Sequence, residues 1–216
     1  MGTDNLHHKR KDKELERKRK RKKVLPYILI VCEGARTEPN YFEWYKENCK
    51  QEINIDICGE GKNTLSLVRE AIAIKKKIEK EKQIIFDQVW CVFDRDSFEI
   101  STYNQAFELA HKNNIKVAYS NECFEVWYLL HFQYFDNEMP RGLVFNKLDN
   151  LMKKEYGIAY KKNTHNICEL LLGKQLTAIK NAKKLESKCS NIGIVHHQNP
   201  STSVYKLVEE LNNYIK

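Results

Sequence analysis

The sequence predicts an α/β fold, in which a mostly parallel four-stranded sheet is flanked by helices and followed by a helical C-terminal part. Three observations predict it. Short apolar runs of strand length alternate with segments of helical apolar spacing between residues 27 and 132. Strands that alternate with helices form parallel sheets with right-handed crossovers. The 216 residues are enough for one sizeable core and too few for two domains of average size.

The first predicted strand, residues 27–34, is an apolar run that closes with Glu33 and Gly34. It leads into a predicted helix, 37–50, with Pro39 near its start, where proline is tolerated. A second unit repeats this order as a short alternating strand, a turn with two glycines and a long amphipathic helix, at 53–57, 59–63 and 64–82. The third and fourth strands are predicted at 87–96 and 115–120, and helices follow them at 102–114 and 121–133.

The remainder of the chain is predicted to be all helical. Apolar residues recur at helical spacing over 143–157, 167–189 and 204–216. Asn199, Ser201 and Thr202 precede the last of these segments and are interpreted as a helix cap. The predicted organisation is therefore a leader at 1–23, an α/β core at 24–135, and a helical part at 136–216 packed on that core.

The charge of the chain is concentrated at its start. Residues 7–23 contain 11 Lys and Arg side chains and 3 acidic ones, whereas the whole chain has a net charge of +8. A segment this charged cannot bury enough apolar surface to order itself, so we expect 1–23 to be a flexible basic leader with affinity for phosphate backbones. No apolar run approaches the roughly 18 residues of a membrane span, and the cysteines lack zinc-ligand spacing. We expect a cytoplasmic protein without membrane association.

Acidic residues close two of the predicted strands. Glu33 ends the first, and Asp94 and Asp96 end the third. The carboxyl ends of parallel strands are where open α/β sheets bind ligands. If the two strands are neighbours, three carboxylates meet there, and a cation must offset their repulsion. Oxygen ligands of this kind suit Mg²⁺ or Mn²⁺.

These residues resemble a known family. A glutamate that closes the first strand and a DxD motif that closes the third resemble the Toprim fold of topoisomerases, primases and related nucleases. The stretches LIVCEGARTEPNYFEWY, VFDRDSF, SNECFEVWYLLHF and NPSTSVYKLVEEL are similar, more narrowly, to RloB, a Toprim-related family encoded near bacterial restriction and defence systems. The resemblance covers residues 7–135 and returns near the carboxyl terminus.

The resemblance implies metal-assisted phosphodiester hydrolysis. Glu33 matches the Toprim glutamate, which serves as a metal ligand or general acid/base, and Asp94 and Asp96 match the metal-binding aspartates. The implied partner is a nucleic acid, either DNA or RNA, including tRNA, in antiphage defence. A toxic nuclease also implies a protein partner or an oligomeric state that controls it.

The segment 121–133 carries two further catalytic candidates. Glu125 follows the fourth strand at the same edge of the sheet and falls on another side of the helix from the aromatic residues, so it is a candidate to assist the metal or the attacking water. His131 is a candidate for phosphate binding or proton donation. It shares a helical face with Trp127, so a buried core histidine is an equally good interpretation.

Three cations are candidate phosphate ligands. Arg36 lies near the start of a helix, where backbone donors also favour anions. Arg95 lies between the two aspartates and either neutralises them or points away. Lys62 lies in GEGKN, which lacks the spacing and ending of a P-loop, so ATP binding is not expected there.

Two alternatives to a nuclease remain at this stage. One is a non-catalytic nucleic-acid-binding or regulatory module with a vestigial acid cluster. The other is a phosphatase or phosphotransferase of the haloacid dehalogenase type, which also places DxD after a strand. That family has the motif on its first strand and needs Thr or Val where this chain has Phe98.

Overall fold

The computed structural model of the chain describes residues 26–49, 53–57, 64–95, 100–164, 166–189 and 199–215. Their strands form one sheet in the order β2-β1-β3-β4-β5. The first four strands pair in parallel and the short fifth strand is antiparallel to β4. The strands are β1 (Ile28–Cys32), β2 (Ile53–Ile57), β3 (Gln88–Asp94), β4 (Lys116–Asn121) and β5 (Ser201–Thr202). The predicted parallel four-stranded sheet is confirmed.

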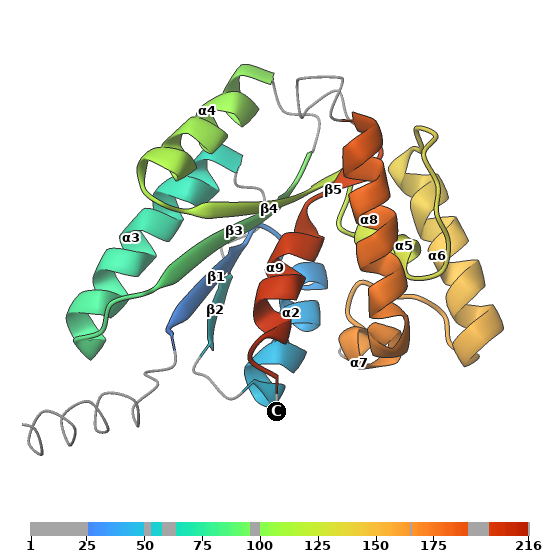
Figure 1. Cartoon of the computed structure of the whole chain (residues 1–216), viewed down its shortest axis with the longest axis horizontal. Coiled ribbons are helices and arrows are strands. Elements are labelled where there is room, and N and C mark those ends of the chain that lie inside the picture. Colours follow the sequence, from blue (N-terminus) through green and yellow to red (C-terminus); the bar gives the residue numbers. More distant parts are fainter. Residues whose placement is uncertain are drawn as a thin grey trace, which may run out of the picture.

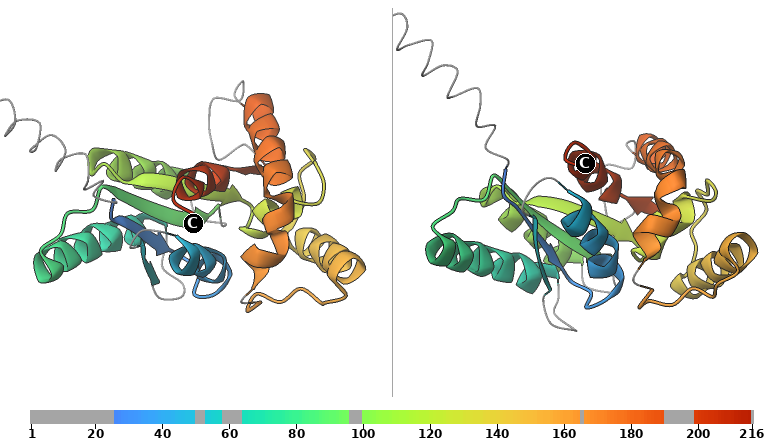
Figure 2. Two further views of the ribbon diagram at one scale, coloured as in Figure 1. Left: turned by 60° about the horizontal axis from the view of Figure 1, so that its bottom comes forward. Right: turned by 90° about the horizontal axis from the view of Figure 1, so that it is seen from below.

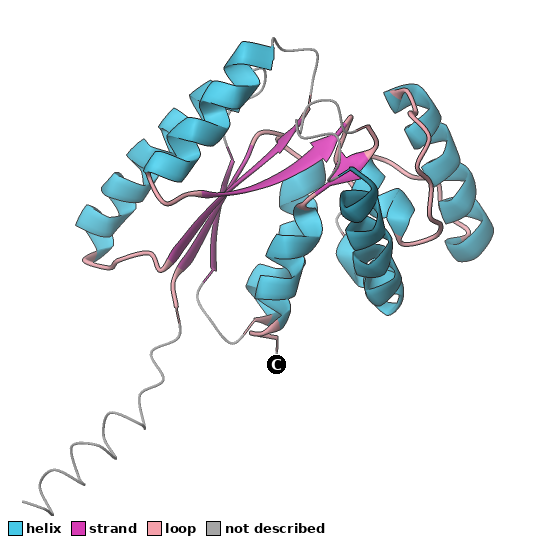
Figure 3. Cartoon of the chain, turned by 45° about the horizontal axis from the view of Figure 1, so that its top comes forward, coloured by secondary structure: helices cyan, strands magenta, loops and turns pink. Residues whose placement is uncertain are grey.

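Helices cover both faces of this sheet (Figures 1 and 3). Three of them follow strands β1, β2 and β3 in turn, and the others follow β4 or belong to the C-terminal part. The helices are α2 (Thr37–Asn48), α3 (Thr64–Lys82), α4 (Ile100–Lys112), α5 (Glu125–Leu130), α6 (Arg141–Tyr156), α7 (Ile167–Leu171), the 3₁₀ turn η1 (Leu172–Lys174), α8 (Gln175–Cys189) and α9 (Val204–Asn212).

Successive side chains of each central strand feed two separate cores, because neighbouring residues of a strand point to opposite faces. In β1, Ile28 and Ile30 pack into the core on the side of α2 and α9, whereas Leu29 and Val31 pack into the core on the side of α3 and α4. All four side chains are fully buried. This double burial is the reason why the strand is an unbroken apolar run.

The C-terminal helices extend the first of these cores beyond the carboxyl end of β4 (Figure 1). Helix α6 lies at the opposite end of the molecule from α3 (Figure 2). The junction is aromatic: the ring of Tyr41, from α2, lies 5.9, 6.4 and 5.6 Å from the rings of Phe124, Trp127 and Tyr128. Large buried rings contribute strongly to core stability, so this cluster fixes α5 against α2.

The prediction that the remainder is all helical was wrong at one place. Ser201 and Thr202, which were expected to cap a helix, form β5 and pair with Asn121 and Ser120. The capping role is confirmed for Thr202, whose hydroxyl accepts a hydrogen bond from the backbone N–H of Val204, the first residue of α9, at 3.2 Å. The same hydroxyl contacts that of Ser120 at 2.9 Å, and the local sequence does not indicate this contact with a distant strand. The single helix expected over 167–189 is also interrupted by η1 around Gly173, a residue that weakens helices.

Candidate active site at the carboxyl edge of the sheet

Glu33 and Asp94 lie at the ends of neighbouring strands. β1 and β3 pair in parallel with Cys32 opposite Val92, and the backbone N–H of Glu33 donates to the Val92 carbonyl at 2.9 Å. Asp94 is the last residue of β3. The expectation that these strands are neighbours is confirmed. Asp96 lies outside the described residues, so the convergence of three carboxylates stays a prediction.

Arg95 and Tyr103 lie beside these acids on the α4 side of the sheet. The backbone N–H of Arg95 donates to the carbonyl of Ser120 at 2.7 Å, and its guanidinium lies 5.5 Å from the centre of the Tyr103 ring. Burial raises the pKa of the Tyr103 phenol. The charge of Tyr119 adds to that rise, followed by those of Asp94 and Glu33, while Arg95 opposes it. The phenol is therefore within electrostatic range of both acids.

Arg141, the first residue of α6, brings a further cation to this edge. Its Nη2 lies 3.8 Å from Oδ2 of Asp94 and donates to the backbone carbonyl of Glu122 at 3.1 Å. The backbone N–H of Arg141 donates to the Glu122 carboxylate at 3.2 Å, and the Asn199 amide donates to the same carboxylate at 3.5 Å. The Arg141 side chain is 35% exposed, so an anionic ligand can reach it.

Glu38 and Glu125 form a second pair of acids, and this pair is buried. Their exposed fractions are 4% and 2%. Glu38 lies in the first turn of α2 and Glu125 begins α5. The hydroxyl of Tyr160 donates to Oε1 of Glu125 at 2.7 Å, and its ring lies 6.1 Å from that of Tyr128. Glu125 therefore turns into the protein rather than into solvent and is held there by a residue from the segment between α6 and α7. Its expected role at the metal stays a prediction.

The buried environment changes the protonation of Glu38. The pKa of Glu38 is raised from 4.5 to about 7. Desolvation by burial is the largest cause and the charge of Glu125 adds to it, while backbone hydrogen bonds and Lys162 oppose the rise. Taking a carboxylate out of water disfavours its charged form. A carboxyl group with a pKa near 7 can both hold and release a proton at neutral pH.

Gly34 explains how Glu38 reaches this position. A Cβ atom at Gly34 would collide with the carboxylate of Glu38. Only glycine permits so close an approach between the loop backbone and a side chain. Gly34 therefore lets the side chain of Glu38 pack against the loop that carries Glu33.

His131 lies in the core. It is 1% exposed, its Nδ1 lies 2.9 Å from the carbonyl oxygen of Trp127, and its ring lies 4.8 Å from the Trp127 ring. Burial lowers the pKa of His131 from 6.5 to about 4, so the neutral form prevails at neutral pH. This placement favours the interpretation as a core histidine over phosphate binding or proton donation, and the catalytic role stays untested.

The three cations predicted to bind phosphate lie in different surroundings. Arg36 is exposed at the N-terminal end of α2, and its carbonyl accepts a hydrogen bond from the backbone N–H of Asn40 at 2.9 Å. Arg95 stacks on Tyr103 as described above. Lys62 lies outside the described residues. A fourth cation, Arg141, which was not among the predicted residues, lies 3.8 Å from the carboxylate of Asp94.

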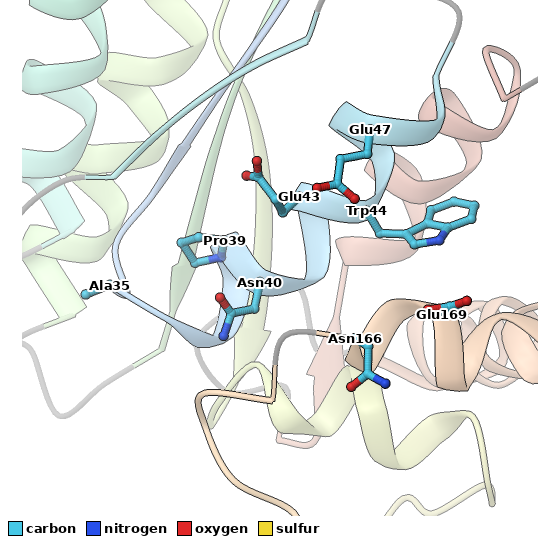
Figure 4. A pocket seen from close by; sticks show the side chains of 8 residues that line it. All are labelled: Ala35, Pro39, Asn40, Glu43, Trp44, Glu47, Asn166 and Glu169. Atoms are coloured by element: carbon cyan, nitrogen blue, oxygen red, sulfur yellow. The ribbon is translucent and has the colours of Figure 1, made fainter.

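A pocket of about 460 Å³ opens between α2 and α7, next to the loop that carries Glu33 (Figure 4). Its wall combines the ring of Trp44 with three carboxylates, those of Glu43, Glu47 and Glu169. Carboxylates repel phosphate groups. The lining of this pocket therefore disfavours a phosphate-bearing ligand.

The side chains at the carboxyl edge of the sheet are of the type that binds divalent cations. Carboxylate oxygens are the ligands that Mg²⁺ and Mn²⁺ prefer, and Glu33 and Asp94 supply them from adjacent strands. Within the described part of the chain, no group of three or more His, Cys, Asp or Glu side chains is arranged to hold a metal ion. The third expected ligand, Asp96, is not part of that set.

Sequence reasoning missed three residues of this region: Glu38, Arg141 and Tyr160. A signal existed for Glu38, because an acid in the first turn of the helix after Glu33 must lie close to the same loop. Arg141 and Tyr160 reach the site from the C-terminal part through contacts with residues 47 and 35 positions away in the sequence. No local pattern marks such contacts.

None of the helices in the described residues has the length and apolar character needed to cross a membrane.

Comparison with known proteins identifies the family. Searches of curated proteins and of solved structures give no significant match. The model of the family described as RloB-like protein matches residues 28–211, which include both acids of the edge, the buried acid pair and Arg141. The chain therefore belongs to the RloB-like protein family.

Proposed function

We propose that this protein is a metal-dependent nuclease that hydrolyses phosphodiester bonds of DNA or RNA, tRNA included, in bacterial defence against phages. The observation that carries the proposal is the placement of Glu33 and Asp94 at the carboxyl ends of adjacent parallel strands. This is the position where open α/β sheets bind their ligands. Membership of the RloB-like family supports it, through the resemblance of that family to Toprim nucleases.

The proposed cofactor is Mg²⁺ or Mn²⁺, with Glu33, Asp94 and Asp96 as its ligands. When bound, such an ion lowers the pKa of a water molecule and polarises the scissile phosphate. The chain supplies the remaining functions. Arg141 is exposed enough to bind a phosphate oxygen and close enough to Asp94 to do so at the same edge.

The buried pair of Glu38 and Glu125 is proposed to hold and release a proton. The raised pKa of Glu38 lies near the pH of the cytoplasm, which is the condition for efficient proton transfer. Tyr160 fixes the orientation of Glu125 through its hydrogen bond. Because Glu38 is withdrawn from solvent, bulk water does not compete for its proton.

The basic leader, residues 1–23, is proposed to increase affinity for nucleic acid, and it lies outside the described residues. Its 11 cations in residues 7–23 would release counterions from phosphate backbones. We propose a cytoplasmic location, where these substrates occur, and a protein partner that restrains an activity that would damage the host cell.

One observation favours a second candidate, a nucleic-acid-binding module without catalysis. Arg141 already supplies a positive charge 3.8 Å from the carboxylate of Asp94. A protein cation can therefore offset part of the acid charge at this edge without a metal. Metal titration separates the two candidates, since only the nuclease needs Mg²⁺ or Mn²⁺.

The test is cleavage by purified protein of single- and double-stranded DNA, RNA and tRNA, in Mg²⁺, in Mn²⁺ and in EDTA. We expect metal-dependent cleavage of at least one substrate and its loss in Asp94→Asn. The matched control is Asp87→Asn, at the opposite end of β3, where the carboxylate accepts a hydrogen bond from the Tyr27 N–H at 2.9 Å. Cleavage that persists in EDTA, or full activity of Asp94→Asn, would contradict the proposal.

A further inference from the structure

The hydroxyl group of Tyr103 is buried, and no described residue forms a hydrogen bond with it. The side chain is 1% exposed and lies in the first turns of α4. Nearly all buried polar groups in folded proteins have a hydrogen-bond partner, because leaving one unpaired costs free energy. The position of this hydroxyl therefore needs a cause other than packing.

Packing accounts for the ring of Tyr103 but not for its oxygen. The ring lies 5.8 Å from that of Phe93 and 5.1 Å from that of Phe107, and the guanidinium of Arg95 lies 5.5 Å from its centre. All three contacts are made by the aromatic face or edge. A phenylalanine would make the same contacts, so the core alone gives no reason for a tyrosine.

The surroundings of the hydroxyl point to the acid edge. The Tyr103 ring contacts Phe93 and Arg95, the residues on either side of Asp94 in the chain. The phenol of Tyr119 has the largest electrostatic effect on the Tyr103 phenol, and Arg95, Asp94 and Glu33 act on it as well. The last three of these charges come from the ends of β1 and β3, whereas Tyr103 comes from α4. An unpaired hydroxyl, withdrawn from solvent, therefore lies within electrostatic range of the two carboxylates at the ends of neighbouring strands.

We propose that the Tyr103 hydroxyl hydrogen-bonds an oxygen atom carried by the cation at the Glu33 and Asp94 edge, which is either a metal-bound water or a phosphate oxygen. The inference rests on the proposed function, since it requires a cation at that edge. Tyr103 is then a positioning residue that orients this oxygen. A neutral hydroxyl suits the task because it donates a hydrogen bond to the oxygen without adding charge to the site.

The experiment measures Mn²⁺ affinity by the electron paramagnetic resonance signal of free Mn²⁺, in the full-length chain and in Tyr103→Phe. One arm contains the metal alone and the other adds dimethyl phosphate, the smallest phosphodiester. Loss of an outer-shell hydrogen bond typically weakens metal binding by about tenfold or more. We expect that change in Tyr103→Phe, with a melting temperature in EDTA equal to or above that of the wild type.

The matched control is Tyr45→Phe. The Tyr45 side chain is also fully buried, but it packs in the core on the other face of the sheet, and its hydroxyl donates to Asn212 at 3.2 Å and accepts from Gln175 at 2.7 Å. Tyr45→Phe should therefore lower the melting temperature in EDTA and leave the Mn²⁺ affinity unchanged. The two variants are expected to show opposite patterns.

The outcomes separate the inference from the function on which it rests. Weaker Mn²⁺ binding by Tyr103→Phe with the metal alone identifies the partner as metal-bound water. A defect that appears only with dimethyl phosphate identifies it as a phosphate oxygen. Equal binding by wild type and Tyr103→Phe in both arms would overturn the role of Tyr103 and leave the nuclease proposal standing. Absence of Mn²⁺ binding by the wild type would overturn both.

Discussion

The guanidinium of Arg141 lies 3.8 Å from the carboxylate of Asp94, although one residue begins α6 and the other ends β3. The C-terminal part of the chain therefore contributes a charge directly to the acid edge of the sheet. Opposite charges at this distance attract each other. A metal ion and Arg141 would compete for the carboxylate of Asp94, and this competition is measurable.

We predict that Arg141→Gln binds Mn²⁺ more tightly and nucleic acid more weakly. Partly exposed ion pairs contribute about 0–1 kcal/mol, so the gain in metal affinity should be about fivefold at most. The slope of log affinity for duplex DNA against log salt should fall by about 0.9, the contribution of one phosphate contact. Calorimetry and fluorescence anisotropy at several salt concentrations provide the two measurements.

Arg141→Lys is the control for Arg141→Gln, because it keeps the charge while losing the planar donor geometry. Its salt slope should match that of the wild type. If Arg141→Gln leaves both affinities unchanged, the contact with Asp94 is a structural feature of the edge and Arg141 binds no phosphate.

Glu38 should make the stability of the protein depend on pH. Burial raises its pKa from 4.5 to about 7, so the folded state retains a proton that the unfolded state loses between these values. The stability linked to this group is fully present below pH 4.5 and is lost as the pH rises through 7. The free energy of unfolding should therefore fall by up to about 3 kcal/mol between pH 4.5 and 8 from this group.

Urea unfolding of wild type and Glu38→Gln at several pH values tests this linkage. Glutamine resembles the protonated carboxyl group and cannot ionise, so the variant should lose the decline in stability. Glu43→Gln is the control, because Glu43 is exposed on the same helix. A pH profile of Glu38→Gln that parallels the wild type would show that the pKa of Glu38 is the same in the folded and unfolded states.

The basic leader should act through salt-dependent binding. We predict that deletion of residues 1–23 leaves the melting temperature unchanged and weakens nucleic-acid affinity. With 11 cations in residues 7–23, the slope of log affinity against log salt should become shallower by several units, since each neutralised phosphate contributes about 0.9 on duplex DNA. An unchanged slope would assign the leader to another partner.

The sheet could be predicted because its signals are local. A strand such as Ile28–Cys32 is buried on both faces, so its sequence is an unbroken apolar run followed at once by polar residues. The adjacency of Glu33 and Asp94 then follows from the order of strands in the sheet. The pairing of Ser201 with Asn121 could not be predicted, since it depends on a contact 80 positions away in the sequence.

The candidate site was predictable only in part for the same reason. Asp94 ends a strand and Glu33 and Glu125 come after strands, and such positions can be recognised from the sequence. Tyr160 reaches Glu125 from the segment after α6, and the raised pKa of Glu38 arises from burial by several elements. This contact and this burial depend on how helices pack on one another. Apolar periodicity indicates which face of a helix is buried, but it does not show which element packs against that face.

Glu125 should be essential for catalysis and dispensable for folding. Its carboxylate is buried and accepts a hydrogen bond from Tyr160 at 2.7 Å. Glu125→Gln keeps the size and an acceptor oxygen for that bond but removes the ability to exchange a proton. We predict a melting temperature close to that of the wild type and a loss of cleavage of roughly 10² or more. A stable variant with full cleavage would exclude Glu125 from the site.

Trp127, two residues further along α5, should behave in the opposite way. Its side chain is fully buried and its ring packs against those of Tyr41 and His131. Trp127→Ala would leave a large cavity and should lower the free energy of unfolding by about 3 to 5 kcal/mol. Cleavage per folded molecule should be unchanged, because Trp127 holds α5 in place without contacting the acid edge. Activity that falls further than the folded fraction, measured by urea unfolding under assay conditions, would mean that this tryptophan also positions Glu125.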